Sequence, residues 1–115
     1  MNSLRIINAL DKVFQSEIQT LETVRLELNE SYTQAIRLLS ECEGSVIVTG
    51  AGKSGIIGNK IASTMTSTGT PAIFLNAGDL MHGDLGRIQS DDVVLAISKS
   101  GETDELLASI PHIRE

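Results

Sequence analysis

The feature that most constrains the fold is the stretch VIVTGAGKSGIIG at residues 46–58, where an apolar run ends at a glycine-rich turn and a helical pattern begins. Residues 46–48 are β-branched and bounded by turn formers, which predicts a strand buried on both faces. Gly50, Gly52 and Gly55 follow, and glycine lets a backbone turn sharply or approach a ligand because no Cβ stands in the way. The stretch therefore predicts a strand, a tight loop and the start of a helix.

The start of this helix is a candidate anion site. A helix that opens near Ser54 directs its unpaired N–H groups and the positive end of its dipole into the space beside the loop, where a phosphate is stabilised. Lys53 and Ser54 add a positive charge and a hydroxyl at the same place. We therefore expect the loop to bind phosphate, and the alternative is a glycine turn that only connects strand and helix.

The glycine spacing is compatible with more than one kind of phosphate loop. The pattern Gly50-x-Gly52-x-x-Gly55 matches the dinucleotide fingerprint, but Asn76 stands near the place of the acid that holds the ribose. A P-loop is excluded because Ile47 occupies the position of its first glycine. A loop that binds a single phosphate on a sugar needs neither the ribose-binding acid nor the first P-loop glycine, so this kind of loop is compatible with the sequence.

Helical periodicity dominates the residues before this stretch. Apolar side chains at steps of three or four predict one amphipathic helix from about Ser3 to Leu28, whose apolar stripe belongs in a core or a subunit interface. Ser31 with Gln34 resembles a capping box that opens a second helix over residues 32–42. We expect Cys42, at its end, to be a small buried hydrophobe.

Strands and helices alternate in the rest of the chain. Residues 72–75 and 93–98 predict a second and a third strand, and residues 102–110 predict the next helix. The alternation predicts an α/β fold, a three-layer α/β/α parallel sheet with right-handed crossovers. The expected domains are residues 1–43, two helices that pack on the domain or form an oligomer interface, and residues 44–115, the first part of the α/β domain. After the glycine turn, apolar residues at helical spacing predict a helix that forms one face of a βαβ unit, namely Ile56, Ile57, Ile61, Ala62 and Met65.

Composition excludes several classes of protein. A length of 115 residues with 41% hydrophobic residues suits one domain or part of one. The net charge of −6 with scattered Lys and Arg argues against nucleic-acid binding through a basic face. The one cysteine excludes a disulfide framework or a zinc finger. No apolar run approaches the length of about 18 residues typical of a membrane span, and no signal-peptide pattern opens the chain. We therefore expect a soluble, cytoplasmic protein that does not contact membranes.

A second candidate anion site follows the third expected strand. Ser98, Ser100 and Thr103 surround Gly101 where that strand gives way to a helix, so hydroxyls and free N–H groups converge there. A simple N-cap with a glycine turn is the alternative. Both loops are expected at the carboxyl edge of the sheet, where open α/β sheets bind ligands. This shared position favours phosphate binding over simple helix capping. The acidic pair Asp91-Asp92 is expected to be a solvated turn before the strand.

The run GAGKSGIIGNKIASTMTSTGTPAIFLNAGDLMHGDLG, followed by ISKSGETDEL, resembles the arabinose-5-phosphate isomerase family of the SIS, or sugar isomerase, domain. The resemblance covers residues 31–113, and GKSG, STGTP, HGDLG and SxSGExxE occur in the order and at the separations typical of that family. Ala51 and residues 76–79 differ from the family pattern, which usually has methionine and a His-Pro-Gly-Glu-like run there. The resemblance implies a flavodoxin-like or Rossmann-like SIS fold.

The resemblance also implies site residues, with Lys53, His82 and Glu105 at active-site positions. Moving a carbonyl between C1 and C2 needs a base for a carbon-bound proton, an acid for the oxygens and stabilisation of an enediolate. We assign Glu105 as the base, Lys53 as the electrostatic stabiliser, and His82 to ring opening or proton transfer. A structural histidine bonded to Asp84 is the alternative for His82. Substrate contacts are implied at Gly52, Ser54, Ser98, Ser100, Gly101 and Thr103, with no metal and no cofactor.

By this resemblance the function is interconversion of D-ribulose 5-phosphate and D-arabinose 5-phosphate, which leads to the eight-carbon acid Kdo of lipopolysaccharide or capsule. The alternatives are a sugar-phosphate sensor that binds the same ligand without chemistry and, third, a nucleotide-binding module. The family also implies a homo-oligomer, a tetramer, whose chain continues with more of the sheet and usually a pair of CBS modules. We expect the 115 residues alone to be incomplete, poorly soluble or domain-swapped, and inactive.

Overall fold

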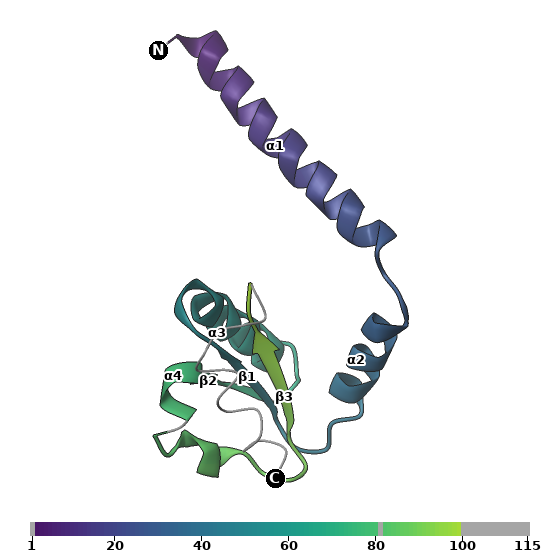
Figure 1. Cartoon of the computed structure of the whole chain (residues 1–115), viewed down its shortest axis with the longest axis vertical. Helices are drawn as coiled ribbons and strands as arrows, with labels where there is room; N and C mark the ends of the chain where they lie inside the picture. Colours follow the sequence, from purple (N-terminus) through teal and green to yellow (C-terminus); the bar gives the residue numbers. More distant parts are fainter. Residues whose placement is uncertain (1, 81, 100–115) are drawn as a thin grey trace. The chain divides into compact units, whose positions relative to one another are not determined.

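Two units make up the chain, Met1–Ile36 and Arg37–Glu115. The structure, a computed structural model, describes residues 2–80 and 82–99 (Figure 1). Among the described residues, no helix is both long enough and apolar enough to cross a bilayer.

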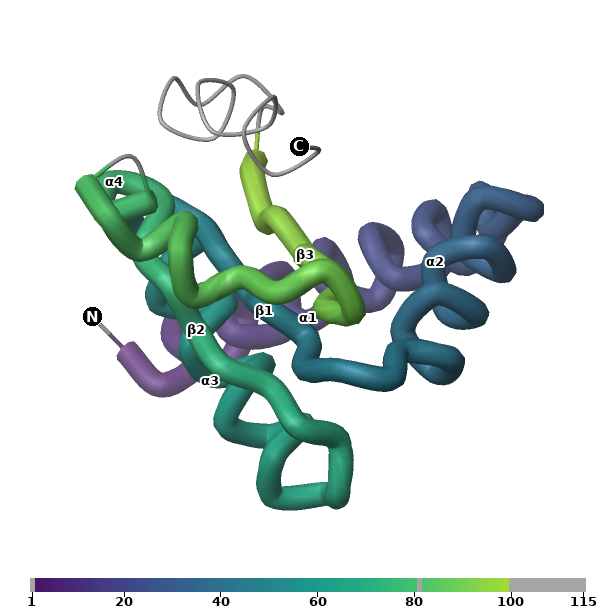
Figure 2. The backbone as a smooth tube through the Cα atoms, turned by 90° about the horizontal axis from the view of Figure 1, so that it is seen from below, coloured from purple at the N-terminus to yellow at the C-terminus, as the bar shows by residue number. Residues whose placement is uncertain are grey.

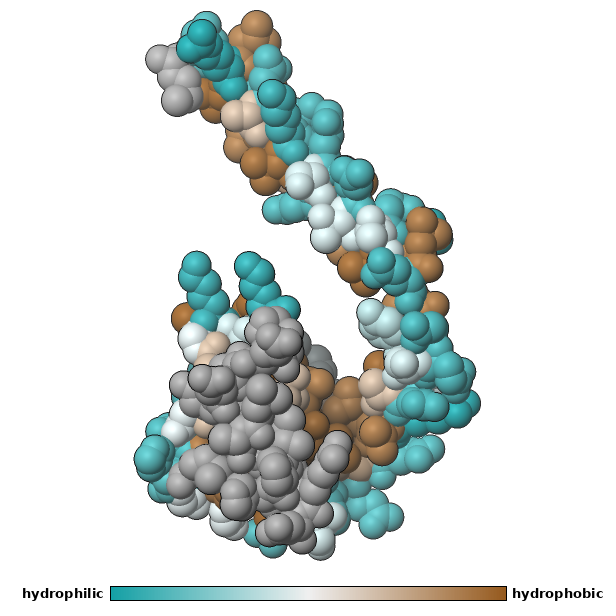
Figure 3. Space-filling model, viewed as in Figure 1, coloured by the Kyte–Doolittle hydropathy of each residue, from teal (hydrophilic) through white to brown (hydrophobic). Residues whose placement is uncertain are grey.

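The first unit contains α1, which spans Ser3–Leu26. Asn2 caps it, because the Asn2 side-chain oxygen accepts a hydrogen bond from the Arg5 backbone N–H at 2.9 Å. The single long helix expected here is confirmed, although it ends two residues before Leu28. Figure 3 shows its apolar side chains among hydrophilic ones. None of its residues is buried, and the exposed apolar side chains include Leu4, Ile7, Leu10, Phe14, Ile18 and Leu21.

The second helix, α2, spans Glu30–Ser40 and begins before the expected start. The expected capping box is wrong, since Ser31 lies inside the helix and its backbone N–H donates to Asn29 Oδ1 at 2.9 Å. An asparagine side chain bonds readily to the backbone two residues on, so it can cap a helix in place of a later serine. Beyond the helix, Cys42 packs on apolar residues of the core as expected, but it is half-buried and not fully buried.

The second unit is built on a parallel sheet (Figures 1 and 2). Its strands are β1 at Val46–Gly50, β2 at Ala72–Asn76 and β3 at Val93–Ile97, in the order β2-β1-β3. Both pairings of the central strand β1 are parallel, and all five of its residues are buried. The expected parallel sheet with a fully buried first strand is therefore confirmed, and the two helices that precede it are present.

One face of the sheet is covered by α3, which spans Gly52–Ser67. Val46 and Val48 point to this face and pack with Ala62 of the helix. Ile56 and Ile57 of the same helix are 72% and 55% exposed. The fully buried positions of α3 are Gly55, Gly58 and Ala62, because the helix lies so close to the strands that small residues must face them.

The opposite face is covered by two short elements that the sequence pattern did not predict. These are α4 at Ala77–Leu80 and the 3₁₀ helix η1 at Asp84–Arg87. Ile47 of β1 and Leu75 of β2 form a buried cluster with Leu80 on this side. Adjacent residues of a strand point to opposite faces, so β1 contributes to both apolar clusters. The three expected layers are thus present in the part of the chain that the structure describes.

The turn before β3 holds the start of β1 in place through Asp92. Its carboxylate accepts hydrogen bonds from the backbone N–H groups of Ser45 and Gln89, each at 2.8 Å. A side chain on Gly44 would collide with Asp92 Oδ1 and with the Asp91 carbonyl oxygen. Asp91 is exposed as expected, but Asp92 is half-buried, so the solvated turn expected for the pair is wrong for Asp92. The reason is that its carboxylate pairs with a backbone donor that lies far away in sequence.

Replacing Asp92 with alanine is expected to lower stability by about 1–3 kcal/mol, because the N–H groups of Ser45 and Gln89 lose their acceptor in a half-buried place. The matched control is Asp91→Ala, since Asp91 contacts this region through its backbone carbonyl and its side chain is exposed. The control is expected to change stability by less than about 0.5 kcal/mol. Thermal unfolding of the complete gene product measures both, and equal effects would contradict the assignment.

Candidate functional site

The candidate site lies where the strand order changes direction. After β1 the chain passes through α3 to β2 on one side, and it then crosses to β3 on the other side of β1. The loops that follow β1 and β3 therefore leave the same carboxyl edge of the sheet from neighbouring strands. Open α/β sheets bind their ligands at such a switch point. The starts of the two loops expected to bind phosphate are thus adjacent.

In the first of these loops, no side chain caps the start of α3, so backbone N–H groups there remain as donors. Gly52, the first residue of α3, has φ of +58°, a left-handed conformation that favours glycine. Ala51 precedes it at the N-cap and forms no side-chain hydrogen bond to the helix. A Cβ built on Gly52 would meet nothing within 4 Å, so the space in front of this residue is open. The geometry suits an anion at the helix start.

The glycines of this loop have separate roles. A Cβ on Gly50 would lie 3.0 Å from the Ser54 carbonyl oxygen, and a Cβ on Gly55 would lie 3.0 Å from the Gly50 oxygen. These two glycines allow helix and strand to touch, whereas Gly52 allows the turn itself. The spacing of the glycines in the sequence does not separate these roles.

Most of the sequence-predicted residues that the structure describes follow the carboxyl ends of the strands. Lys53 is exposed and Ser54 half-buried, both directly after the turn that leaves β1. His82 comes after β2 and α4, and Ser98 comes directly after β3. The exposed Lys99 adds a second positive charge beside Ser98. Outside the described residues lie Ser100, Gly101, Thr103 and Glu105.

His82 lies in an exposed turn. Its backbone N–H donates to the Asp79 carbonyl oxygen at 3.0 Å, and Gly83 beside it has φ of +117°. Within residues 2–80 and 82–99, no hydrogen bond joins the His82 side chain to Asp84. The structural alternative for His82 therefore lacks its expected partner, and the imidazole is accessible from solvent.

Asn76, at the end of β2, serves the local turn. Its side-chain oxygen accepts a hydrogen bond from the Gly78 backbone N–H at 2.9 Å. A dinucleotide site would use an acid at the end of this strand to bind the ribose. Asn76 carries no negative charge and its side-chain oxygen already has a donor, which disfavours the dinucleotide alternative.

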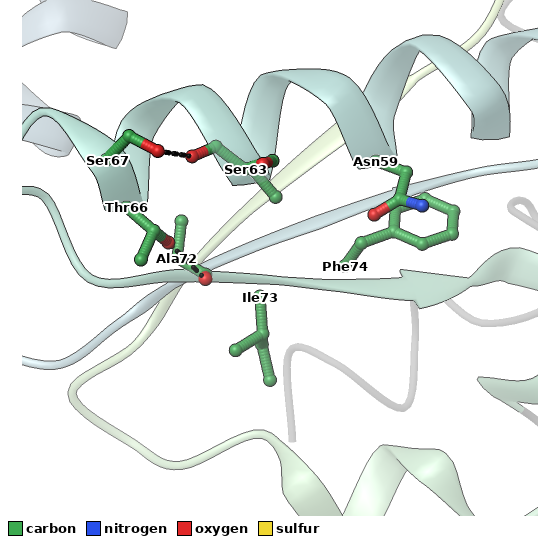
Figure 4. Close-up of a pocket in the computed structure, with 8 residues that line it drawn as sticks. Asn59, Ser63, Thr66, Ser67, Ala72, Ile73 and Phe74 are labelled. Atoms are coloured by element: carbon green, nitrogen blue, oxygen red, sulfur yellow. Dashed lines mark hydrogen bonds between the residues drawn. The ribbon is translucent and has the colours of Figure 1, made fainter.

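A hollow of about 340 Å³ between α3 and β2 lies away from this edge (Figure 4). Two of its hydroxyls already have partners, since Thr66 Oγ1 donates to the Ala72 carbonyl and Ser67 Oγ donates to the Ser63 carbonyl, each at 2.9 Å. A further hollow of about 320 Å³ is lined by acidic side chains, namely Glu41, Glu43, Asp91 and Asp92. Neither suits a phosphate, because one lacks a positive charge and the other would repel an anion.

Thr49 is a polar residue of this region that the sequence reasoning missed. It is fully buried, and its hydroxyl is the one buried side-chain oxygen or nitrogen without a hydrogen-bond partner in the described part of the chain. An unpaired buried hydroxyl costs about 1–3 kcal/mol, so it is rarely retained without a reason. The available signal was a threonine in the otherwise apolar strand Val46–Gly50.

No group of three or more His, Cys, Asp or Glu side chains in residues 2–80 and 82–99 is placed to hold a metal ion. The described residues that follow the carboxyl ends of the strands offer backbone donors, hydroxyls, two lysines and an imidazole. Such a set suits a small, negatively charged, oxygen-rich ligand.

Comparison with known proteins adds to this geometry. The model of the SIS domain matches residues 38–115. Arabinose 5-phosphate isomerase KdsD of Yersinia pestis is 48% identical over 103 residues, which are 90% of this chain and 31% of that protein. Arabinose 5-phosphate isomerase GutQ of Escherichia coli K12 is 43% identical over 110 residues, which are 96% of this chain and 34% of that protein. The chain thus spans about a third of the length of these curated relatives.

A solved structure is also similar. The Escherichia coli CFT073 protein c3406, in complex with arabinose 5-phosphate, matches with a TM-score of 0.91 and 40% identity. The match covers 99% of this chain and 61% of that one.

Substituting Gly52 with alanine is expected to destabilise the protein by about 1–2 kcal/mol, because a residue with a Cβ is strained in the left-handed conformation. Gly86→Ala is the matched control, since a Cβ there also meets open space but Gly86 has no positive φ. Comparison of the thermal midpoints of the two variants with that of the unchanged protein measures the difference. A control that is as unstable as the Gly52 variant would show that strain at φ of +58° is not the cause.

Proposed function

The chain belongs to the SIS-domain family, and from this membership we propose that the complete gene product is a sugar-phosphate aldose-ketose isomerase. The observation that carries the proposal is the adjacency of β1 and β3, because the loops that contain Lys53 and Ser98 then begin at one switch point. The named activity of two relatives above 40% identity gives further support.

The proposed reaction interconverts D-ribulose 5-phosphate and D-arabinose 5-phosphate. It rests on the name of the relatives and on a similar solved protein in complex with arabinose 5-phosphate. A product of this kind would supply synthesis of Kdo for lipopolysaccharide or capsule, in the cytoplasm.

The proposed chemistry moves one proton between neighbouring carbons. A base removes a proton from C1 of the ketose, the electrons form an enediolate, and a proton returned to C2 gives the aldose. Glu105 is the proposed base, Lys53 the cation that stabilises the developing negative charge, and His82 the group that exchanges protons with ring or carbonyl oxygens. The overall step is redox-neutral, so it requires no external electron acceptor.

The phosphate is proposed to bind across the switch point. The α3 start offers N–H groups and the end of a helix dipole, while Lys53 and Lys99 supply positive charge. The proposed contacts are Gly52, Ser54, Ser98, Ser100, Gly101 and Thr103.

The activity assay uses the complete gene product, with ribulose 5-phosphate as substrate and arabinose 5-phosphate as the product detected. Lys53→Met is expected to lower kcat by about 100-fold, because one electrostatic stabiliser of the enediolate is lost. Lys60→Met is the control, since Lys60 is an exposed lysine farther along the same helix, and it is expected to retain normal turnover. Glu105→Gln is expected to abolish turnover while sugar-phosphate binding persists.

Three results would contradict parts of this proposal. A folded gene product that converts no ribulose 5-phosphate would exclude the reaction. Turnover that survives Glu105→Gln would remove the proposed base, and a protein that binds arabinose 5-phosphate without turning it over would favour the sensor in place of the enzyme.

The domain arrangement is proposed to be helices at residues 1–43 before the SIS domain that starts at residue 44, with the exposed apolar stripe of α1 in a subunit interface. Leu10 and Ile18, 51% and 60% exposed, belong to that stripe. Light scattering on the complete gene product is expected to give the mass of a homo-oligomer, a tetramer by analogy with the family. Leu10→Glu with Ile18→Glu is expected to lower the mass, and a monomer before any substitution would contradict the proposal.

A further inference from the structure

The hydroxyl of Thr49 is enclosed by protein and yet has no protein partner among the described residues. Its exposed fraction is 0%, the same as that of Val48 beside it in the strand. A valine would fill the same space without an unpaired polar group. The retention of a polar atom at this position therefore calls for a partner that is not part of the described chain.

The register of the sheet places Thr49 at the candidate site. It is the last residue but one of β1, and it pairs with Leu75 of β2 and with Ala96 of β3. Leu75 belongs to the cluster with Ile47 and Leu80, so the Thr49 side chain lies on that face, opposite α3. Thr49 thus lies one residue before the carboxyl end of the strand that forms the switch point.

The neighbouring residue shows where the enclosure ends. Ala96, which shares the face of Thr49, is exposed, although the strand residues before it are half-buried. Paired strands lie about 4.8 Å apart, so an exposed residue is the direct neighbour of Thr49 in the sheet. Ser98, two residues beyond Ala96, is a proposed contact of the sugar phosphate. Thr49, near the end of β1, and Ser98, directly after β3, therefore lie at the same edge of the sheet on neighbouring strands.

We propose that Thr49 is a substrate-binding residue, whose hydroxyl forms its hydrogen bond with an oxygen of the bound sugar phosphate. The proposal rests on the isomerase function proposed above and adds a residue to it. In the ligand-free protein the Thr49 hydroxyl has no hydrogen-bond partner among the described residues. When the sugar phosphate binds, the hydroxyl forms a hydrogen bond with it. Its contribution should therefore be seen in ligand affinity and not in the stability of the free protein.

The test compares Thr49→Val with Thr49→Ser in the complete gene product. The valine removes the hydroxyl and keeps the branched shape, so arabinose 5-phosphate should bind about tenfold more weakly by calorimetry, the effect of one lost hydrogen bond. The thermal midpoint of the ligand-free valine variant should be unchanged or raised, because an unpaired buried hydroxyl is gone. Thr49→Ser returns the hydroxyl and should recover most of the affinity, while the missing methyl group lowers the midpoint.

A control variant separates affinity from general destabilisation. Val48→Ala creates a cavity on the opposite face, beside α3, and should lower the midpoint without weakening ligand binding. If Val48→Ala weakens binding as much as Thr49→Val does, the effect of Thr49 is indirect and the proposal fails.

Three further outcomes would overturn the proposed role of Thr49. A Thr49→Val protein with a lowered midpoint and unchanged affinity would show that the hydroxyl bonds to another part of the protein, and the proposal would be wrong. Unchanged midpoint and unchanged affinity would equally overturn it. Failure of the unaltered protein to bind arabinose 5-phosphate would overturn both the proposed function and the role of Thr49. Equal binding by the unaltered protein and by Thr49→Val would overturn only the role of Thr49.

Discussion

The second unit depends on the close contact of α3 with β1 and β2. Two glycines of the helix face the strands where a side chain would be crowded, and a Cβ on Gly58 would lie 3.2 Å from both Val48 Cγ1 and Phe74 Cε2. A Cβ on Gly55 would press on the Gly50 carbonyl oxygen at 3.0 Å. Glycine lowers helix propensity by about 1 kcal/mol per residue, so its use in mid-helix implies a gain elsewhere. Here the gain is dispersion contact and burial of the central strand.

This contact also places the start of α3. Because the helix lies directly on β1, the turn between them is short, and its backbone donors remain at the carboxyl edge of the sheet. The bulky apolar residues Ile56 and Ile57 are then directed outward. Lys53 lies one turn earlier and is exposed as well. The same packing that stabilises the sheet thus keeps a cation and unpaired N–H groups beside the switch point.

The two faces of β1 have different chemistry. The face toward α3 carries Val46 and Val48, while the other face carries Ile47 and then Thr49 near the switch point. That second face is covered by α4 and η1, which contribute Leu80 and Leu85 to the cluster over the strands. A strand buried on both sides is the least tolerant place for an unpaired polar group. The position of Thr49 therefore links the packing of the sheet to the proposed binding of ligand.

Local patterns in the sequence determined the strands, the long helices and the parallel sheet, because periodicity and turn residues report the environment of each segment. The family motifs also located Lys53, Ser54, His82 and Ser98, which the structure describes after the carboxyl ends of its strands. Only the tertiary structure decided which glycines serve packing and which face of α3 is buried. It also decided which acidic side chain accepts hydrogen bonds from the backbone and which buried hydroxyl lacks a partner among the described residues. The residues concerned are Gly50, Gly55, Gly58, Ile56, Ile57, Asp92 and Thr49. Each of these features depends on how separate elements pack against one another, and the local sequence pattern around a residue does not determine that packing.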